Sequence, residues 1–281
     1  MKPAPDTSHG FGPATGAAAA APAGAEERAA PATLPSAVWR WLGRVPFDET
    51  SVLQERLRSE IVAGSGPETL LLLEHDPVIT LGRAAVAANV LASADELARR
   101  GVALHRTTRG GDVTYHGPGQ LVGYPIVRLR RGVRAHVEGM AAALSEVLAA
   151  CGVAAHYRGD APGLWTRAAS GIDKKICAFG INVHHRVAMH GFALNLAPAL
   201  DAFSLIVPCG LVGVAVTSVR EATGRAAPTP AALAPQVAEA LGRHLGLTLA
   251  PAAAQDSIKD PVQDPIAEIA TAASADTMDR A

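Results

Sequence analysis

The run Thr69–Glu74 restricts the possible folds more than any other segment, because it reads TLLLLE and places four leucines in succession. Successive side chains of a strand point to opposite faces, so such a run is buried only where both faces of its sheet are covered. Helices are the usual covers of a sheet of this kind. One helix is predicted just upstream, where Leu53, Leu57 and Ile61 recur at four-residue spacing until Gly64 ends the pattern.

The remaining apolar patterns extend this arrangement along the chain. Asp48 is the predicted N-cap of the first helix, and Ser93 with Glu96 three residues later forms the capping box of a shorter one. Strands and helices alternate, but several neighbouring strands are too close in sequence for helical crossovers. We therefore expect an α/β (α+β) protein, a single domain with a mixed β-sheet flanked by helices. The expected strands are 38–42, 69–74, 78–81, 102–107, 121–129, 176–184 and 187–196, and the later helices are 93–101, 137–151 and 233–245.

Composition divides the chain into a core and two tails. Of residues 1–36, 22 are Ala, Pro or Gly, and residues 251–281 are rich in Ala, with six acidic against two basic side chains. Neither segment carries enough large apolar side chains to offset the entropy of ordering it, so both are predicted to be disordered. Residues 37–250 are expected to form one folded domain, which is long enough to bury a core without covalent cross-links.

Charge and cysteine usage exclude several classes of protein. A net charge of −1 gives no reason to expect a nucleic acid as partner. Three cysteines are an odd number, which argues against a disulfide framework and for a reducing compartment. No run of about 18 apolar residues is present, and the alanine tract 17–21 is too short for the core of a signal peptide. The sequence therefore predicts a soluble, cytoplasmic protein with no membrane partner.

The segment Arg109–Gln120 reads RGGDVTYHGPGQ and is unusually rich in glycine. Glycine is favoured where the backbone takes a positive φ or lies against another group. The exposed N–H groups of such a loop, with Arg109 at its start, can hold a carbonyl, carboxylate or phosphate group. A long hairpin loop without any ligand explains the composition equally well. The segment is neither a G-x-G-x-x-G motif nor a P-loop.

A lysine and two cysteines stand where reactive groups are worth considering. In DKKICAFGINV, strict alternation places Lys175, Cys177 and Phe179 on one face of a strand, where a lysine either extends its amine to solvent at an edge or has a partner. Cys209 in IVPCGLVG is flanked by proline and glycine, so its thiol is expected to project from a turn. Cys151 lies on the apolar face of a predicted helix and is expected to serve packing. Both a structural thiol and a nucleophile remain open for Cys209 on this pattern alone.

Ten histidines raise the question of a metal site. His184, His185 and His190 are the densest group, with His116 in the glycine-rich segment. Their spacing matches neither H-E-x-x-H nor a zinc ribbon, and the cysteines form no C-x-x-C, so no metal is expected. A Ser-His-Asp hydrolase is disfavoured as well, because the chain has no G-x-S-x-G elbow.

Six segments together resemble the lipoyl(octanoyl) transferase family, in the family's order. They read LLLEHDPVITLGR, RGGDVTYHGPGQLVGYPI, DAPGLW, KKICAFGI, HGFALN and FSLIVPCG. The matching segments extend from about Leu70 to Ser218, and they depart from the family at Ile79, where an aromatic residue is frequent, and in the turn 184–186. The resemblance implies the fold that this family shares with the biotin and lipoate protein ligases. It also implies that residues 37–250 form a catalytic acyltransferase domain.

The resemblance further implies an activity and a set of site residues. Members of the family transfer an octanoyl group from octanoyl-acyl carrier protein to a lysine of lipoyl domains, without a cofactor, as the first step of endogenous protein lipoylation. The acceptors are the lipoyl domains of the 2-oxoacid dehydrogenase complexes and the H protein of glycine cleavage. The acyl group rests as a thioester on the cysteine that matches Cys209, and the catalytic lysine matches Lys175. The implied substrate-binding residues are Arg109, Gly110, Gly111, Asp112, Val113, Thr114, Tyr115, His116, Ala178, Phe179, Gly180, Gly191, Phe192 and Ala193.

Elementary electrostatics is consistent with an ion pair between the thiolate of Cys209 and the ammonium of Lys175. An ammonium about 4 Å from a sulfur supplies on the order of 4 kcal/mol at an effective dielectric constant near 20, enough to favour the thiolate of a thiol whose ordinary pKa is about 8.5. Two other functions remain open. An ATP-dependent ligase on the same fold needs no cysteine nucleophile, and a non-catalytic protein that binds lipoyl domains or acyl chains would gain no covalent octanoyl group.

Overall fold

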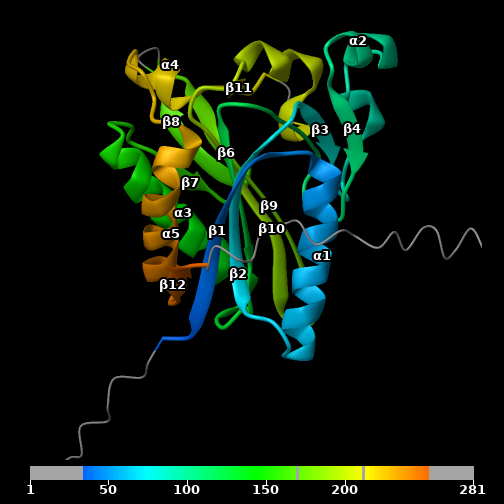
Figure 1. Ribbon diagram of the computed structural model, residues 1–281. Coiled ribbons are helices and arrows are strands. Elements are labelled where there is room, and N and C mark those ends of the chain that lie inside the picture. The colour runs from blue at the N-terminus through cyan, green and yellow to red at the C-terminus, as the bar shows by residue number, and fades with distance from the viewer. Residues whose placement is uncertain (1–33, 169–170, 211–212, 253–281) are drawn as a thin grey trace, which may run out of the picture. The chain divides into compact units, whose positions relative to one another are not determined.

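The computed structural model describes residues 34–252, except residues 169–170 and 211–212 and the side chain of Cys209 (Figure 1). Residues 1–33 and 253–281, on which most of the two predicted tails fall, lie outside the described residues. The strands are β1 (Ser36–Val45), β2 (Glu68–His75), β3 (Val78–Leu81), β4 (Ala103–Arg106), β5 (Val113–His116), β6 (Gln120–Ile126), β7 (His156–Arg158), β8 (Gly163–Arg167), β9 (Asp173–His184), β10 (Val187–Asn195), β11 (Ala215–Val216) and β12 (Thr248–Pro251). The helices are α1 (Phe47–Ala63), α2 (Ala94–Arg99), α3 (Gly132–Ala150), α4 (Val219–Thr223) and α5 (Pro230–Leu245), with short 3₁₀ turns η1 (Ala87–Asn89), η2 (Leu200–Leu205) and η3 (Pro208–Gly210).

Within the described residues, the strands form a nine-stranded mixed sheet and a smaller three-stranded sheet. The order in the larger sheet is β12-β1-β2-β6-β10-β9-β8-β7, and β11 pairs with β9. β1 is parallel to both of its neighbours, whereas the path from β2 to β7 is antiparallel. The strands from β7 to β10 follow each other closely in the chain and are joined in antiparallel pairs, which short connections allow. The expected mixed sheet flanked by helices is confirmed.

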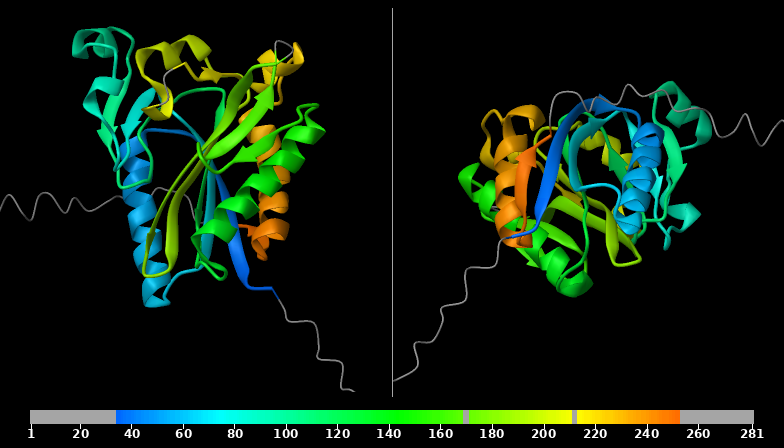
Figure 2. Two further views of the ribbon diagram at one scale, coloured as in Figure 1. Left: turned by 180° about the vertical axis from the view of Figure 1, so that it is seen from behind. Right: turned by 60° about the horizontal axis from the view of Figure 1, so that its bottom comes forward.

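Helices cover both faces of the larger sheet, as the leucine run requires (Figures 1 and 2). Leu70 and Leu72 enter the core under α3 and α5, and Leu71 and Leu73 enter the core under α1 on the opposite face. All four side chains are buried. The successive leucines of β2 therefore alternate between two separate cores, and each contributes the ~1.5–3 kcal/mol that full burial of a leucine is worth.

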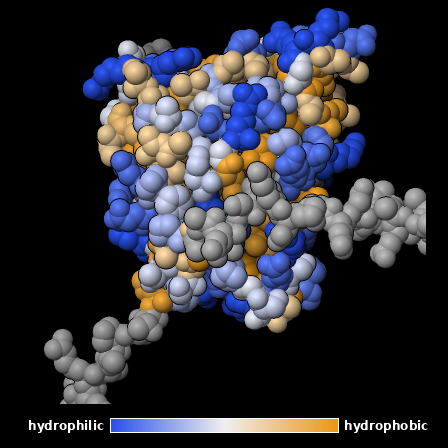
Figure 3. All heavy atoms as spheres, in the orientation of Figure 1, coloured by the Kyte–Doolittle hydropathy of each residue, from blue (hydrophilic) through white to orange (hydrophobic). Residues whose placement is uncertain are grey.

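The smaller sheet has the order β4-β3-β5 and packs with α2 and η2 around a third core. Its outer surface is hydrophilic over α2, where Asp95, Arg99 and Arg100 are exposed (Figure 3). β3 continues directly from β2, and β5 leads directly into β6, so the two sheets share the two chain segments that cross between them. No helix among the described residues is long and apolar enough to cross a bilayer.

The predicted helix starts have different outcomes. The capping box of α2 is confirmed, since the Ser93 side chain accepts a hydrogen bond from the Glu96 N–H at 3.2 Å. The predicted Asp48 N-cap is wrong: α1 begins at Phe47 with Pro46 in the cap position, and Asp48 lies inside the first turn. A carboxylate in the first turn still interacts favourably with the helix dipole, which explains why the local sequence resembles a cap.

Candidate functional site

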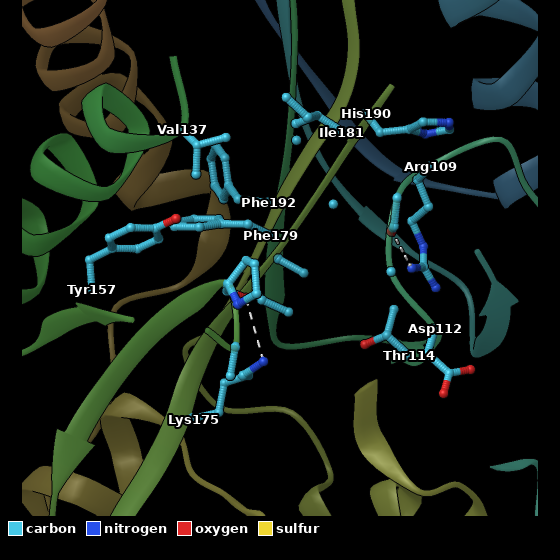
Figure 4. A pocket seen from close by; sticks show the side chains of 18 of the residues that line it. Arg109, Asp112, Thr114, Val137, Tyr157, Lys175, Phe179, Ile181, His190 and Phe192 are labelled. Atoms are coloured by element: carbon cyan, nitrogen blue, oxygen red, sulfur yellow. Dashed lines mark hydrogen bonds between the residues drawn. The ribbon is translucent and has the colours of Figure 1, made fainter. Parts of the chain in front are cut away.

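A cavity of about 700 Å³ opens between the larger sheet, the loop before β5 and the N-terminal half of α3 (Figure 4). Its volume falls in the range of ~300–1,000 Å³ that is usual for small-molecule sites. The lining includes Lys175 and, of the implied substrate-binding residues, Arg109, Gly110, Gly111, Asp112, Thr114, His116, Ala178, Phe179, Gly180, Gly191, Phe192 and Ala193. The residues that the sequence did not single out are Phe47, Tyr124, Val133, Arg134, Val137, Glu138, Tyr157, Gly159, Asp160, Ala161, Pro162 and Ile181.

Lys175 lies on the wall of this cavity and is only 4 % exposed. Its Nζ donates to the carbonyl oxygen of Pro162 at 3.4 Å (Figure 4). The same nitrogen lies 4.9 Å from the centroid of the Trp165 ring. A buried ammonium is costly unless such partners replace water, and a carbonyl and an aromatic face are both suitable. The lysine that interrupts an apolar strand is therefore not one that extends its amine to solvent.

A β-bulge sets the direction of the Lys175 side chain. β9 pairs Cys177 with Leu164 of β8 but Lys175 with Trp165, so Ile176 is the extra residue. Ile176 and Cys177 both lie in the core under α3 and α5, whereas Lys175 lines the cavity. The predicted alternation that placed Lys175 and Cys177 on one face is wrong. The extra residue reverses the alternation between them, so the amine reaches the cavity and the thiol does not.

Four side chains from four elements form an apolar wall (Figure 4). Phe179 of β9 and Phe192 of β10 are cross-strand partners, and Tyr157 of β7 meets Phe179 with the ring centroids 6.1 Å apart. Val137 of α3 completes the wall. The Phe192 ring lies directly over Gly123 of β6, where any side chain would collide with it. Aromatic and aliphatic groups of this kind favour an apolar ligand.

The opposite wall is the glycine-rich loop before β5, which is tied to the rest of the fold by hydrogen bonds. The Arg109 guanidinium donates to the carbonyl oxygen of Thr80 at 2.6 Å and to its hydroxyl at 2.9 Å. The Gly110 N–H donates to the carbonyl oxygen of Ile181 at 2.9 Å. A Cβ on Gly180 would lie 3.1 Å from the carbonyl oxygen of Gly110, so the loop crosses β9 where a glycine allows close approach. The glycines therefore serve backbone packing in a wall of the cavity.

Alternation along β5 separates the implied residues of this segment. Thr114 and His116 line the cavity, but Val113 and Tyr115 point to the other face and are buried in the core of the smaller sheet. The Tyr115 ring meets that of Phe203 with the centroids 5.5 Å apart. The implied role in substrate binding therefore has no support for Val113 and Tyr115, because a strand presents every second side chain to its opposite face.

Buried histidines lie beside the cavity in their neutral form. Desolvation lowers the pKa of His75 to about 4 and those of His116 and His190 to about 3. His75 Nδ1–H donates to the carbonyl oxygen of Val45 at 2.9 Å, so its Nε2 accepts from the Tyr124 hydroxyl at 2.7 Å. Among the described residues, no three His, Cys, Asp or Glu side chains gather where they could share a metal ion.

A chain of hydrogen bonds leads from His116 to the backbone of Lys175. His116 Nδ1–H donates to Gln120 Oε1 at 2.7 Å, and Gln120 Nε2–H donates to Asn195 Oδ1 at 2.9 Å. Asn195 Nδ2–H donates to the carbonyl oxygen of Thr217 at 3.0 Å. The N–H of Thr217 in turn donates to the carbonyl oxygen of Lys175 at 2.9 Å. Buried polar groups inside strands were the only sequence signal for Gln120 and Asn195. This chain holds β5, β6, β10 and β9 together at one end of the cavity.

Cys209 belongs to η3, and its side chain lies outside the described residues. The backbone of this turn is closed by a hydrogen bond from the Gly210 N–H to the carbonyl oxygen of Val207 at 3.0 Å. A second, small cavity of about 10 Å³ is lined by both Pro208 and Lys175. Pro208, the residue that precedes Cys209, and Lys175 therefore line one common space.

The other two thiols are poorly suited to act as nucleophiles. Cys177 is fully buried, and Cys151 is half-buried at the end of α3. Burial raises the pKa of both thiols above the ordinary value, which disfavours the reactive thiolate.

Comparisons with known proteins cover the part of the chain that forms this cavity. The family model of the lipoyl protein ligase A/B catalytic domain matches residues 48–242, which include both walls of the cavity and η3. An octanoyltransferase of Geotalea uraniireducens (strain Rf4) is 45 % identical over 186 residues, which are 65 % of this chain and 81 % of that protein. This chain belongs to the lipoyl(octanoyl) transferase family. An octanoyltransferase of Leifsonia xyli subsp. xyli (strain CTCB07) is 41 % identical over 214 residues, which are 75 % of this family member and 92 % of that protein. One of Myxococcus xanthus is 45 % identical over 191 residues, but the chain spans only 54 % of that longer relative.

Solved structures with the same fold are lipoate protein ligases. The bipartite ligase of an archaeal lipoylation system, from Thermoplasma acidophilum, has a TM-score of 0.60 at 16 % identity, covering 78 % of this family member and 87 % of that chain. A lipoate-protein ligase A bound with ATP also has a TM-score of 0.60 at 16 % identity, covering 77 % and 88 %. At this identity the likeness concerns the fold alone. It confirms the lipoate ligase fold that the family resemblance implied.

Proposed function

We propose that this protein transfers an octanoyl group from octanoyl-acyl carrier protein to a lysine of a lipoyl domain, through a thioester on Cys209. The octanoyltransferases among its relatives support the transferred group, and the lipoate ligase fold supports a lipoyl domain as acceptor. The observation that carries the proposal is the buried amine of Lys175, on the wall of a largely apolar cavity and beside the turn that holds Cys209.

In the first half-reaction, the Cys209 thiolate attacks the carbonyl carbon of the carrier thioester. A free thiol with a pKa of about 8.5 is only a few per cent thiolate at pH 7. The Lys175 ammonium offsets this, because one charge about 4 Å away is worth on the order of 4 kcal/mol at an effective dielectric constant near 20. The tetrahedral intermediate collapses with loss of the carrier's sulfur, which takes a proton from Lys175. The products are the acyl-enzyme, the carrier thiol and a neutral Lys175 amine.

In the second half-reaction, the acceptor lysine attacks the acyl carbon as a neutral amine. The new C–N bond forms, the C–S bond to Cys209 breaks, and the proton lost by the acceptor nitrogen passes to Lys175. This restores the thiolate and the ammonium, so the cycle is balanced in protons. One thioester is exchanged for another and then for an amide, so no ATP is consumed.

The proposed binding site of the hydrocarbon chain is the apolar wall formed by Val137, Tyr157, Phe179 and Phe192. Each buried methylene contributes about 0.8 kcal/mol, so two carbons more or less change the affinity by about fifteen-fold. The enzyme is therefore expected to prefer one chain length without excluding its neighbours.

Intact mass after mixing with octanoyl-acyl carrier protein tests the proposal. The protein should gain one octanoyl group, which peptide mapping should locate on Cys209, and a lipoyl domain added afterwards should remove it. Cys209→Ser should abolish the gain, and the matched control Cys151→Ser should retain it, because Cys151 lies outside the cavity lining.

Two results would overturn the proposal in different ways. Modification of a lipoyl domain by free octanoate and ATP, undiminished in Cys209→Ser, would identify a ligase. Binding of the acylated carrier with no covalent gain would identify a non-catalytic binder.

A further inference from the structure

Asp112 lies on the cavity wall, but its carboxylate is hydrogen-bonded to residues that do not line the cavity. Its Oδ1 accepts the N–H of Val86 at 3.0 Å, and its Oδ2 accepts a hydrogen bond from Nδ2 of Asn89. A carboxylate can only accept hydrogen bonds, and the carbonyl oxygen of an acyl thioester can also only accept. The side chain of Asp112 is therefore unsuited to hold the reacting carbonyl, and the substrate-binding role that the family resemblance implied for this residue stays a prediction.

The partners of Asp112 hold the segment that leads to Cys209. The carbonyl oxygen of Asn89 accepts the N–H of Val207 at 2.8 Å. Two residues on, the Leu91 N–H donates to the carbonyl oxygen of Leu205 at 2.8 Å. The segment around Asn89 is thus bound on one side to Asp112 and on the other to residues 205–207, immediately before η3.

The far end of η3 packs on the same two side chains. Gly210 has a φ of +67°, and a Cβ there would lie 3.2 Å from Asn89 Nδ2 and would collide with Asp112 Oδ2. The backbone of the turn therefore lies directly on the Asp112–Asn89 pair. Val207 and Gly210, which flank Pro208 and Cys209, are both fixed by it.

We infer that Asp112 and Asn89 are positioning residues, which hold the η3 turn so that Cys209 meets Lys175; the inference rests on the proposed function of Cys209. Lys175 stands on β9 in the middle of the larger sheet, whereas η3 belongs to neither sheet. The geometry between nucleophile and amine therefore depends on contacts outside the two sheets. A misplacement of about 1 Å is enough to slow a reaction about 100-fold.

Exchange of the two side chains tests this inference. In Asp112→Asn an amide N–H₂ opposes either Asn89 Nδ2 or the Val86 N–H, and in Asn89→Asp two carboxylates face each other. The double variant Asp112→Asn with Asn89→Asp restores one donor facing one acceptor and keeps an oxygen for Val86. Asp76→Asn is the control, because Asp76 binds the exposed Arg44 away from the cavity.

Single-turnover octanoylation of Cys209 and the pH dependence of its alkylation by iodoacetamide are the readouts. Each single variant should acylate about 10–100-fold more slowly than the wild type. Its alkylation midpoint should move toward the ordinary thiol pKa of about 8.5. The double variant should return to within about threefold of the wild type, as expected when exchanged partners restore one interaction. Gly210→Ala should behave like the single variants.

Wild-type acylation in the single variants, or no recovery in the double variant, would overturn the inference. Lower thermal stability with an unchanged alkylation midpoint would show a structural role only, and would overturn it as well. If the wild type takes up no octanoyl group, the proposed function fails. The alkylation profiles need no acyl substrate, so they still decide whether the Asp112–Asn89 pair positions the thiol.

Discussion

We expect the folded protein to lose stability steeply as the pH falls from 7.5 to 5.5, because it buries four histidines in their neutral form. Burial lowers the pKa of His75 and His136 to about 4 and those of His116 and His190 to about 3, from an ordinary value of 6.5. All four are at most 7 % exposed, so solvent does little to screen the effect.

The sign and size of the effect follow from proton linkage. Below pH 6.5 the unfolded chain takes up protons on these histidines and the folded chain does not, so acid favours the unfolded state. The loss continues until the pH reaches the folded pKa values of about 3 to 4. Each histidine costs about 1.4 kcal/mol per pH unit once the unfolded form is protonated, so the four together remove about 5 kcal/mol between pH 7.5 and 5.5. Single domains have only about 5–15 kcal/mol of stability in total.

Urea unfolding at pH 7.5 and 5.5 measures this loss directly. His136→Gln, which removes one titrating group that is not among the residues lining the cavity, should reduce the loss to about 4 kcal/mol. His184→Gln, at an exposed position at the end of β9, should leave it at about 5 kcal/mol. A loss below about 1 kcal/mol in the wild type would refute the reasoning, since the four histidines would then titrate alike in both states.

Three further predictions concern the site. Lys175→Ala should raise the pKa of Cys209 toward about 8.5, seen as a higher midpoint of pH-dependent alkylation, and an unchanged profile would refute the ion pair. Phe192→Leu should enlarge the space beside the apolar wall and favour decanoyl over octanoyl thioesters by up to about fifteen-fold, in competition assays read by intact mass. An unaltered ratio would show that the hydrocarbon chain of the substrate binds elsewhere. Tyr124→Phe should lower the free energy of unfolding at pH 7.5 by about 1–3 kcal/mol, measured in urea, because His75 Nε2 loses its donor. A change near zero would show that this hydrogen bond is absent.

Local sequence patterns were sufficient to predict the structure where the environment of a residue depends on residues close to it in the sequence. The four leucines of β2 require cover on both faces, and the structure supplies a different core for each alternate pair. The capping box at Ser93 involves only residues three apart. In such cases the chemistry of one short segment decides the structure.

The geometry of the site depends on contacts between distant segments, which no local pattern encodes. The bulge at Ile176 is a feature of the pairing between β9 and β8, and it determines where Lys175 points. Alternation within β5 excludes Val113 and Tyr115 from the cavity, yet the strand lies inside a segment whose glycines indicate a loop. From patterns alone, Lys175 and Cys209 each had an ordinary structural explanation. The family resemblance singled them out.

The two sheets contribute opposite sides of one cavity, and this division offers a route to redesign. Thr114 and His116 stand on β5 of the smaller sheet, just after the loop that carries Arg109, whereas Lys175 and the aromatic residues of the apolar wall stand on strands of the larger sheet. A chimaera that takes residues 77–116 from a relative would exchange one wall while keeping the recipient's amine and nucleophile. The segment around Asn89 binds residues 205–207 mainly through backbone hydrogen bonds. These contacts between the exchanged segment and the recipient protein would therefore be retained in the chimaera.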